Sequence, residues 1–238
     1  MDEALADLEY GAGSMAELLD RLGGISPNRV RLTPPPGTAT VRDVVRLRDK
    51  TRRIYELVDG TLVEKVLGAP ESFVAGEVLM HIKNWNRDHG NLGMVLGADG
   101  PMKLMKKLVR IPDVSYTNWD RVPGGCVPSA PVPDLAPDLA VEVLSEGNTR
   151  AEMERKLKEY FLSEVQLVWY IDPRTRTVRA YTSPDNVTEL GESDTLDGGT
   201  VLPGFSVEVA RIFDQLAPAP KPAKPPKTSE GKKPRKRK

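Results

Sequence analysis

DLAVEVLS at residues 138–145 and VQLVWYIDP at residues 165–173 decide the fold, because each of them reads as a strand. The first is a nearly continuous apolar run, rich in valine and interrupted only by Glu142. A short run of this kind is typical of a strand that is buried on both faces. An ionised carboxylate at such a position is costly unless a partner neutralises it. We therefore take Glu142 as the first candidate for a functional side chain.

The segment between these strands predicts an amphipathic helix. It opens at Thr149, and Glu152 three residues later gives the pattern of a capping box. The apolar stripe of this helix consists of Met153, Leu157, Tyr160 and Phe161. Lys156 lies on the flank of the stripe, whereas Lys158 falls toward solvent. A strand–helix–strand unit of this length predicts a right-handed crossover between parallel strands, which would bring Lys156 close to Glu142.

Length and composition are those of one ordinary soluble α/β domain. The chain has 238 residues, of which 39% are hydrophobic and 29% are charged, and it is long enough to bury a core of its own. No apolar segment approaches the ~20 residues that cross a bilayer, and the acidic N-terminus lacks the basic start of a signal peptide. The single Cys126 excludes an internal disulfide and a cysteine-based zinc site. These features predict a cytoplasmic protein without a membrane partner.

The net charge of zero hides a strong asymmetry. Residues 217–238 hold nine Lys or Arg and one Glu, so that the remaining chain has 25 basic and 33 acidic residues. This tail is rich in proline and lysine and is predicted to be disordered. It could contact phosphates by displacing their counterions, bind an acidic partner, or serve solubility alone. Because the tail offers no aromatic side chain for stacking on bases, we do not expect it to read sequence.

The rest of the chain divides into a leader and one domain. Residues 1–39 contain several proline and glycine breaks and read as a poorly ordered leader. One folded domain is expected over residues 40–216, with the tail at residues 217–238 after it. Thr40 is predicted to cap the first helix of this domain, which runs to about residue 50.

A β-hairpin is predicted around Asp59-Gly60, because this dipeptide between two β-rich runs is the strongest short signal for a hairpin. The runs are residues 54–58 and 61–66, and Glu56 lies on the first of them. A long amphipathic helix is predicted to follow at residues 71–89.

A proline interrupts the next predicted strand, residues 108–116. Pro112 lies in its middle and Asp113 follows directly, which argues for a sheet edge, a bulge or a break in pairing. The chain thus offers four charged candidates on strands, beside strands or on the crossover helix: Glu56, Asp113, Glu142 and Lys156.

Three carboxylates that are drawn together repel one another unless a divalent cation lies between them. Oxygen ligands of this kind suit Mg²⁺ or Mn²⁺ better than zinc. A lysine beside such a site can hold or help to activate a water molecule, while the metal stabilises charge on a phosphate under attack. This combination is the chemistry of phosphodiester hydrolysis.

Several motifs occur in a fixed order along the chain. They are YELVDGTLVE (55–64), IPDVSY (111–116), APDLAVEVLS (136–145), ERKLKEY (154–160), VWYIDP (168–173) and VLPGFS (201–206). Over roughly residues 40–216 this series resembles the Uma-type restriction endonuclease family, within the PD-(D/E)XK nuclease superfamily. The resemblance implies an α/β fold with a restriction-endonuclease-like core, in which helices flank a central mixed β-sheet. It also implies a metal-dependent endonuclease that acts on phosphodiester bonds, with DNA as the expected partner.

The resemblance also assigns roles to single positions. It makes Asp113 and Glu142 ligands of a Mg²⁺ or Mn²⁺ cofactor, with the Val143 carbonyl as a further ligand and Glu56 as a supporting one. All of these except Val143 would count as catalytic, together with a lysine. Restriction enzymes of the superfamily often work as dimers, so a homodimer is compatible with this assignment.

The position of the lysine departs from the usual pattern of the superfamily. There the lysine follows the glutamate by two residues, but this position is Leu144 here. The resemblance therefore places the lysine on the following helix, where Lys156 is the candidate and its place beside the buried stripe favours it over Lys158.

Each candidate also has a purely structural interpretation. Glu142 could be an ion-pair partner, Asp113 could cap a turn, and Lys156 could extend along the helix surface to reach solvent. Glu56 could pair with a nearby Arg or Lys. The corresponding alternative function is a catalytically silent nuclease-fold protein that binds nucleic acid or a protein partner.

Overall fold

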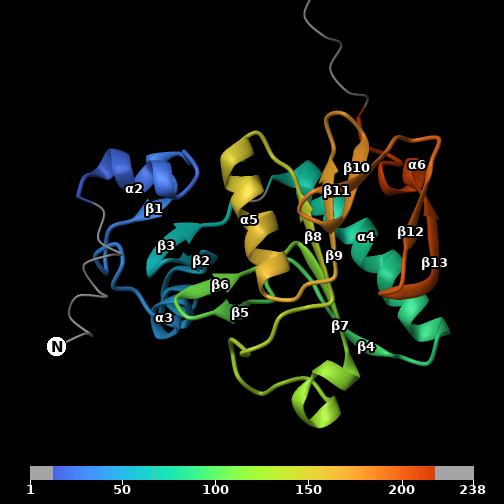
Figure 1. Ribbon diagram of the computed structural model, residues 1–238, viewed down its shortest axis with the longest axis horizontal. Coiled ribbons are helices and arrows are strands. Elements are labelled where there is room, and N and C mark those ends of the chain that lie inside the picture. Colours follow the sequence, from blue (N-terminus) through green and yellow to red (C-terminus); the bar gives the residue numbers. More distant parts are fainter. Residues whose placement is uncertain (1–12, 67, 218–238) are drawn as a thin grey trace, which may run out of the picture.

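The computed structural model describes residues 13–66 and 68–217, and this part of the chain contains three β-sheets (Figure 1). The largest sheet has the strand order β11 (Asn186–Leu190), β10 (Thr177–Ser183), β9 (Leu167–Asp172), β8 (Leu139–Val143), β7 (Val114–Asn118) and β4 (Gly93–Leu96). The second has the order β1 (Val30–Arg31), β3 (Thr61–Glu64), β2 (Tyr55–Val58), β6 (Leu108–Arg110) and β5 (Met102–Met105). The third pairs β12 (Thr195–Gly198) with β13 (Leu202–Glu208).

The helices pack on and between these sheets. The α-helices are α2 (Met15–Arg21), α3 (Val41–Thr51), α4 (Ala69–Asp88), α5 (Arg150–Leu162) and α6 (Val209–Ile212). Short 3-10 helices form at η1 (Pro27–Arg29), η2 (Trp119–Arg121) and η3 (Pro123–Gly125). Within the described residues, no helix combines the length and the apolar character that crossing a membrane requires.

The predicted crossover is present. β8 and β9 pair in parallel, and α5 connects them. Every other pair of neighbours in the six-stranded sheet is antiparallel. The sheet is therefore mixed, and the predicted fold class, an α/β protein with a central mixed sheet flanked by helices, is confirmed.

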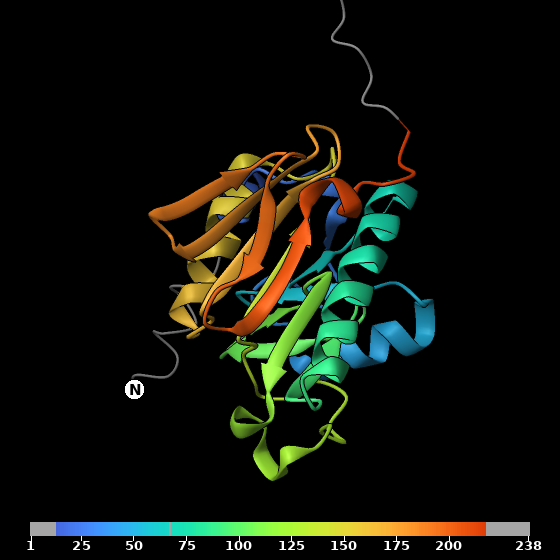
Figure 2. The same cartoon turned by 90° about the vertical axis from the view of Figure 1, so that its right-hand side faces the viewer.

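Both faces of β8 are buried because a helix covers each of them. Leu139 and Val141 pack with α4 on one face, and Figure 2 shows this helix lying along the sheet. Ala140 and Leu144 pack with α5 on the other face. Since side chains alternate along a strand, Glu142 points toward α5.

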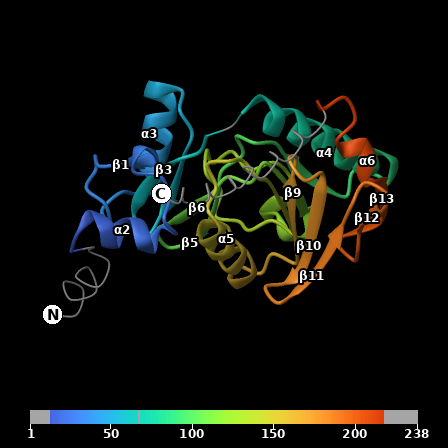
Figure 3. The same ribbon diagram turned by 90° about the horizontal axis from the view of Figure 1, so that it is seen from above.

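The helix α5 lies between the six-stranded and the five-stranded sheets, as Figures 1 and 3 both show. Its Thr149 cap accepts a hydrogen bond from the backbone N–H of Glu152 at 3.0 Å. Only this half of the predicted capping box forms, because the Glu152 carboxylate pairs with Arg29 at 2.7 Å instead. A charge-assisted bond to a guanidinium is stronger than one to a neutral backbone amide.

The predicted hairpin and the predicted helix after Thr40 are both present, and the latter has a complete capping box. The strand predicted over residues 108–116 is instead two strands in different sheets, β6 and β7. The chain leaves the five-stranded sheet at Pro112, which has no N–H to donate to a ladder. Asp113 therefore lies where the two sheets meet.

The prediction of a poorly ordered leader is wrong for residues 13–39. Leu18, Leu22 and Ile25 are buried against the five-stranded sheet, and β1 pairs with β3. The proline and glycine residues of this segment break regular structure but still allow apolar side chains to pack. Residues 1–12 and 218–238 lie outside the described residues, so the disorder expected there stays a prediction.

Two neighbouring glycines test whether this segment packs on α5. Gly23 and Gly24 both have positive φ angles, 86° and 70°. A Cβ atom at Gly23 would lie 2.5 Å from the backbone nitrogen of Glu152, whereas a Cβ at Gly24 would meet nothing within 4 Å. We expect Gly24→Ala to cost about 1–2 kcal/mol of stability through its left-handed backbone alone. Gly23→Ala should cost about 1–3 kcal/mol more through overpacking.

Urea unfolding of the two glycine variants measures this difference, because they share the same change in backbone freedom. Equal losses of stability in both variants would contradict the packing of this segment on α5.

Candidate active site

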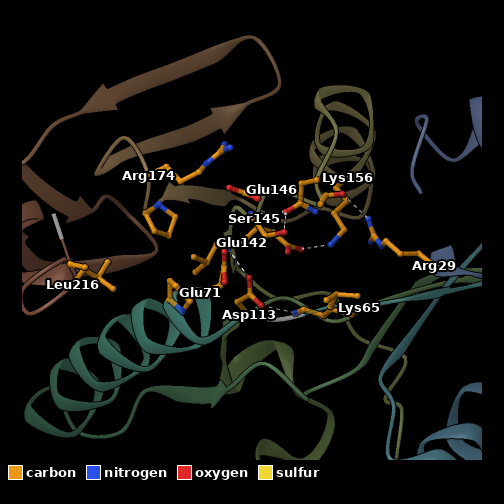
Figure 4. Close-up of a pocket in the computed structure, with 18 residues that line it drawn as sticks. Arg29, Lys65, Glu71, Asp113, Glu142, Ser145, Glu146, Lys156, Arg174 and Leu216 are labelled. Atoms are coloured by element: carbon orange, nitrogen blue, oxygen red, sulfur yellow. Dashed lines mark hydrogen bonds and ion pairs between the residues drawn. The ribbon is translucent and has the colours of Figure 1, made fainter. Parts of the chain in front are cut away.

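A cavity of about 740 Å³ opens beside the end of β8. Charged side chains from separate parts of the chain line its wall, and Figure 4 shows them. They include Arg29, Lys65, Asp113, Glu142, Lys156 and Arg174. The structure thus brings three of the four predicted charged residues to one cavity, and the fourth, Glu56, contacts Lys156 from behind the cavity wall.

Glu142 is 4% exposed and faces α5. Its Oε1 atom accepts hydrogen bonds from the Tyr160 hydroxyl at 2.5 Å and from Lys156 Nζ at 3.1 Å. Within the described residues, its Oε2 atom has neither a hydrogen bond nor an ion pair. Burial raises the pKa of Glu142, and the negative charges of Asp113 and Glu56 raise it further against the opposing lysines. The two lysines therefore do not fully offset the burial of this carboxylate, and its charged form is less favourable than it would be in water.

Lys156 is 3% exposed and joins two carboxylates. Its Nζ atom lies 3.1 Å from Glu142 Oε1 and 3.2 Å from Glu56 Oε1. Burial alone would lower its pKa, but these two carboxylates outweigh burial and raise it. Lys156 is therefore protonated at neutral pH. An ammonium has three N–H donors, so one donor remains for a group in the cavity that Lys156 lines.

Glu56 is 1% exposed, and both of its oxygens accept hydrogen bonds. Oε2 accepts one from Arg110 Nη1 at 2.7 Å, and Oε1 accepts one from the backbone N–H of Ile111 at 3.1 Å. Burial opposes ionisation, yet Lys156 and Arg110 prevail and hold the pKa of Glu56 well below its usual range. Arg110 also donates to Glu159 Oε2 at 2.5 and 2.8 Å, which ties the cluster to α5.

Asp113 is fixed by the strand beside it and by a lysine. Its Oδ2 atom accepts the backbone N–H of Val143 at 2.7 Å. Its Oδ1 atom forms an ion pair with Lys65 Nζ at 2.8 Å but has no aligned hydrogen bond in the described part of the chain. Lys65 also donates to the Ile111 carbonyl. Figure 4 shows Lys65 pointing toward Asp113, and Lys156 toward Glu142.

Two carboxylates of the cavity, Asp113 and Glu142, could hold a magnesium or manganese ion. Among the described residues, no group of three Asp, Glu, His or Cys side chains is arranged to hold a metal, and both oxygens of Glu56 already have partners. Asp113 Oδ1 and Glu142 Oε2 are the oxygens without a hydrogen bond, and the Val143 carbonyl lies on the same strand. Mg²⁺ commonly binds one or two carboxylates and keeps several waters. The expectation that Glu56 is also a ligand stays a prediction.

Sequence reasoning missed Lys65, Arg110 and the hydroxyl of Tyr160. The sequence predicts Tyr160 only as a member of the apolar stripe, and Arg110 contacts partners that are 54 and 49 residues away. A signal for Lys65 does exist in the sequence. A two-residue hairpin turn pairs Glu56 with Val63, so that Lys65, two residues further, lies on the same face as Glu56.

A comparison with protein families identifies the family of this chain. The family model described as "Uma2: Putative restriction endonuclease" matches residues 41–210. The chain belongs to this family. Among solved structures, one similar chain is described as "a putative nuclease belonging to DUF820 from Anabaena variabilis ATCC 29413". Its TM-score is 0.60 at 17% sequence identity, and the match covers 68% of this chain and 91% of that chain. No curated protein matches.

Membership of the Uma2 family and the likeness in fold agree with each other. The likeness confirms the restriction-endonuclease-like fold that the motifs predict. Family and fold together indicate a nuclease.

Proposed function

We propose that this protein is a metal-dependent endonuclease that hydrolyses phosphodiester bonds in DNA. The observation that carries the proposal is the buried Lys156 side chain, which lies between Glu142 and Glu56 and lines the cavity. Asp113 and Glu142 would hold the ion through the oxygens that lack hydrogen bonds. When bound, Mg²⁺ or Mn²⁺ would make water a better nucleophile and stabilise the charge that develops on the phosphate.

Lys156 acts in this proposal as a donor. Because it is protonated, its free N–H can orient the attacking water through a lone pair of the water oxygen, or it can bind a phosphate oxygen. It cannot take a proton in this state. Glu56 and Tyr160 then have supporting roles: Glu56 holds the ammonium, and Tyr160 fixes the Glu142 oxygen that Lys156 also contacts.

Cleavage assays test the proposal directly. Purified protein is incubated with supercoiled plasmid, linear duplex DNA and RNA, with Mg²⁺, with Mn²⁺ or with EDTA. We expect DNA cleavage only with metal. Asp113→Asn and Glu142→Gln should each lower its rate by at least about 10²-fold, with unchanged circular dichroism spectra.

The failures of this assay have distinct meanings. If the protein cleaves neither DNA nor RNA with either metal, it is a silent nuclease-fold protein that binds nucleic acid or a protein partner. Cleavage of RNA alone would overturn the choice of DNA, and equal rates in EDTA would overturn the dependence on metal.

The basic tail is proposed to attract DNA to the cavity. The remainder of the chain has 25 basic and 33 acidic residues, and a body of this charge repels a polyanion. Leu216 and Ala217 line the cavity, so the tail starts at its edge.

The proposal also includes a cytoplasmic location and a homodimer. Light scattering of the purified protein tests whether it is a dimer.

Deleting residues 218–238 is expected to weaken DNA binding and to flatten its salt dependence. Each phosphate contact contributes about 0.9 to the slope of log affinity against log salt concentration, so a loss of several contacts is measurable. A second variant keeps the length of the tail but replaces its nine Lys and Arg residues by Gln. Wild-type affinity and slope in both variants would contradict a role of the tail in DNA binding.

A further inference from the structure

We propose that Lys65 competes with the metal for Asp113 and thereby sets the metal affinity of the site. Its ammonium would neutralise Asp113 while the site holds no ion and would have to move when an ion binds. This inference rests on the proposed function only in taking Asp113 as a metal ligand.

The hairpin delivers Lys65 to this position. The backbone N–H of Lys65 donates to the Ile54 carbonyl at 2.9 Å, which continues the pairing of β2 with β3 by one residue. The side chain lies on the same sheet face as Glu56 and is 7% exposed. Its Nζ atom donates to the Ile111 carbonyl and lies 2.8 Å from Asp113 Oδ1. The Lys65 ammonium is therefore held by two buried partners, which distinguishes it from a lysine in a chance contact at the surface.

The geometry around Asp113 favours one oxygen as a metal ligand. Oδ2 already accepts the backbone N–H of Val143 at 2.7 Å, whereas Oδ1 accepts no aligned hydrogen bond among the described residues, so Oδ1 is the better ligand for an ion. Mg²⁺ requires its oxygen ligands at about 2.0–2.1 Å, and an ammonium next to the same buried oxygen would repel it strongly. Lys65 also lines the cavity, which gives its side chain room to turn away from Asp113.

Lys156 provides the contrast within the same cluster. It contacts Glu142 through Oε1, which Tyr160 also contacts, and Oε2 has no hydrogen bond or ion pair among the described residues. A metal can therefore reach Glu142 while Lys156 stays in place. Removing either lysine takes one positive charge from the cluster, but only removal of Lys65 frees the oxygen that a metal would use.

Direct titration with Mn²⁺ tests the inference. The electron paramagnetic resonance signal of free Mn²⁺ reports binding without any need for cleavage. We expect Lys65→Met to bind Mn²⁺ about tenfold or more tightly than the wild type does. Lys156→Met is the control for the loss of one positive charge, and we expect Lys65→Met to bind Mn²⁺ more tightly than this control. Lys65→Gln removes the charge but keeps N–H donors for Ile111 and Asp113, and it serves if Lys65→Met does not fold.

The outcomes separate this inference from the proposed function. Equal or weaker Mn²⁺ binding by the Lys65 variants, relative to the wild type, would overturn competition even if the protein cleaves DNA. An equal gain in the Lys65 and Lys156 variants would reduce the effect to net charge and would overturn it too. If the Lys65 variants bind Mn²⁺ more tightly but the wild-type protein shows no nuclease activity, competition is supported and the proposed nuclease function is rejected. An absence of Mn²⁺ binding in every variant would overturn both.

Discussion

Replacing Arg110 by methionine is expected to lower the free energy of unfolding by about 3–5 kcal/mol, the usual cost of removing one member of a buried ion cluster. Arg110 is 2% exposed and lies between Glu56, at 2.7 Å, and Glu159, at 2.5 Å. Without it, each carboxylate keeps one cation, Lys156 for Glu56 and Arg155 for Glu159. The oxygens that faced Arg110 would remain buried and unpaired.

Urea unfolding without metal measures this loss. Arg150→Met is the matched control, because Arg150 forms a similar ion pair with Glu154 but its side chain is 93% exposed, so the change should stay within about 0.5 kcal/mol. Adding Glu56→Gln to Arg110→Met should recover part of the loss, since it removes one of the stranded charges. A loss below about 1 kcal/mol in Arg110→Met would mean that water compensates the two carboxylates.

The sequence predicts those parts of the site that depend on local pattern. Glu142 stands out because it interrupts an apolar strand, and Lys156 stands out because it lies beside the stripe of the helix that returns to that strand. A crossover of this length constrains where its helix can lie, so the pairing of these two residues follows from the sequence of residues 138–173 alone. The position of Asp113 beside them follows from the family resemblance and from a proline that breaks a strand.

The remaining parts depend on contacts between distant segments. Arg110 joins Glu56 to Glu159 only when the five-stranded sheet packs against α5. No periodicity in the sequence predicts that these two elements pack together. The burial of residues 13–39 is a similar case, because proline and glycine suggest an irregular path whereas Leu18 and Leu22 supply the apolar surface that packs. Lys65 differs from these cases, since the hairpin register alone places it on the face of Glu56.

Lys156→Met is expected to lower kcat for DNA cleavage by about 10²–10³-fold, the typical loss on removing one oriented donor from an enzyme site. The third N–H of Lys156 is the one that its two carboxylate contacts leave for the reacting groups. The affinity for uncleaved DNA, measured with Ca²⁺ in place of Mg²⁺, should change much less, because one buried donor contributes little to binding along the phosphate backbone. The ratio of the two effects separates a catalytic role from a binding role.

Two controls make this prediction specific to the buried ammonium. Lys158→Met removes a lysine of the same helix that is exposed, and it should leave kcat unchanged. Tyr160→Phe removes the neighbouring hydrogen bond to Glu142 Oε1 without changing any charge. Such a bond to a carboxylate contributes about 1.5–3 kcal/mol, and because Tyr160 acts only through Glu142, we expect kcat to fall less than in Lys156→Met. If Lys156→Met is folded and cleaves DNA within about tenfold of the wild-type rate, a loss well below the typical one, then Lys156 is a structural counter-ion of Glu56 and Glu142, and another group must orient the attacking water.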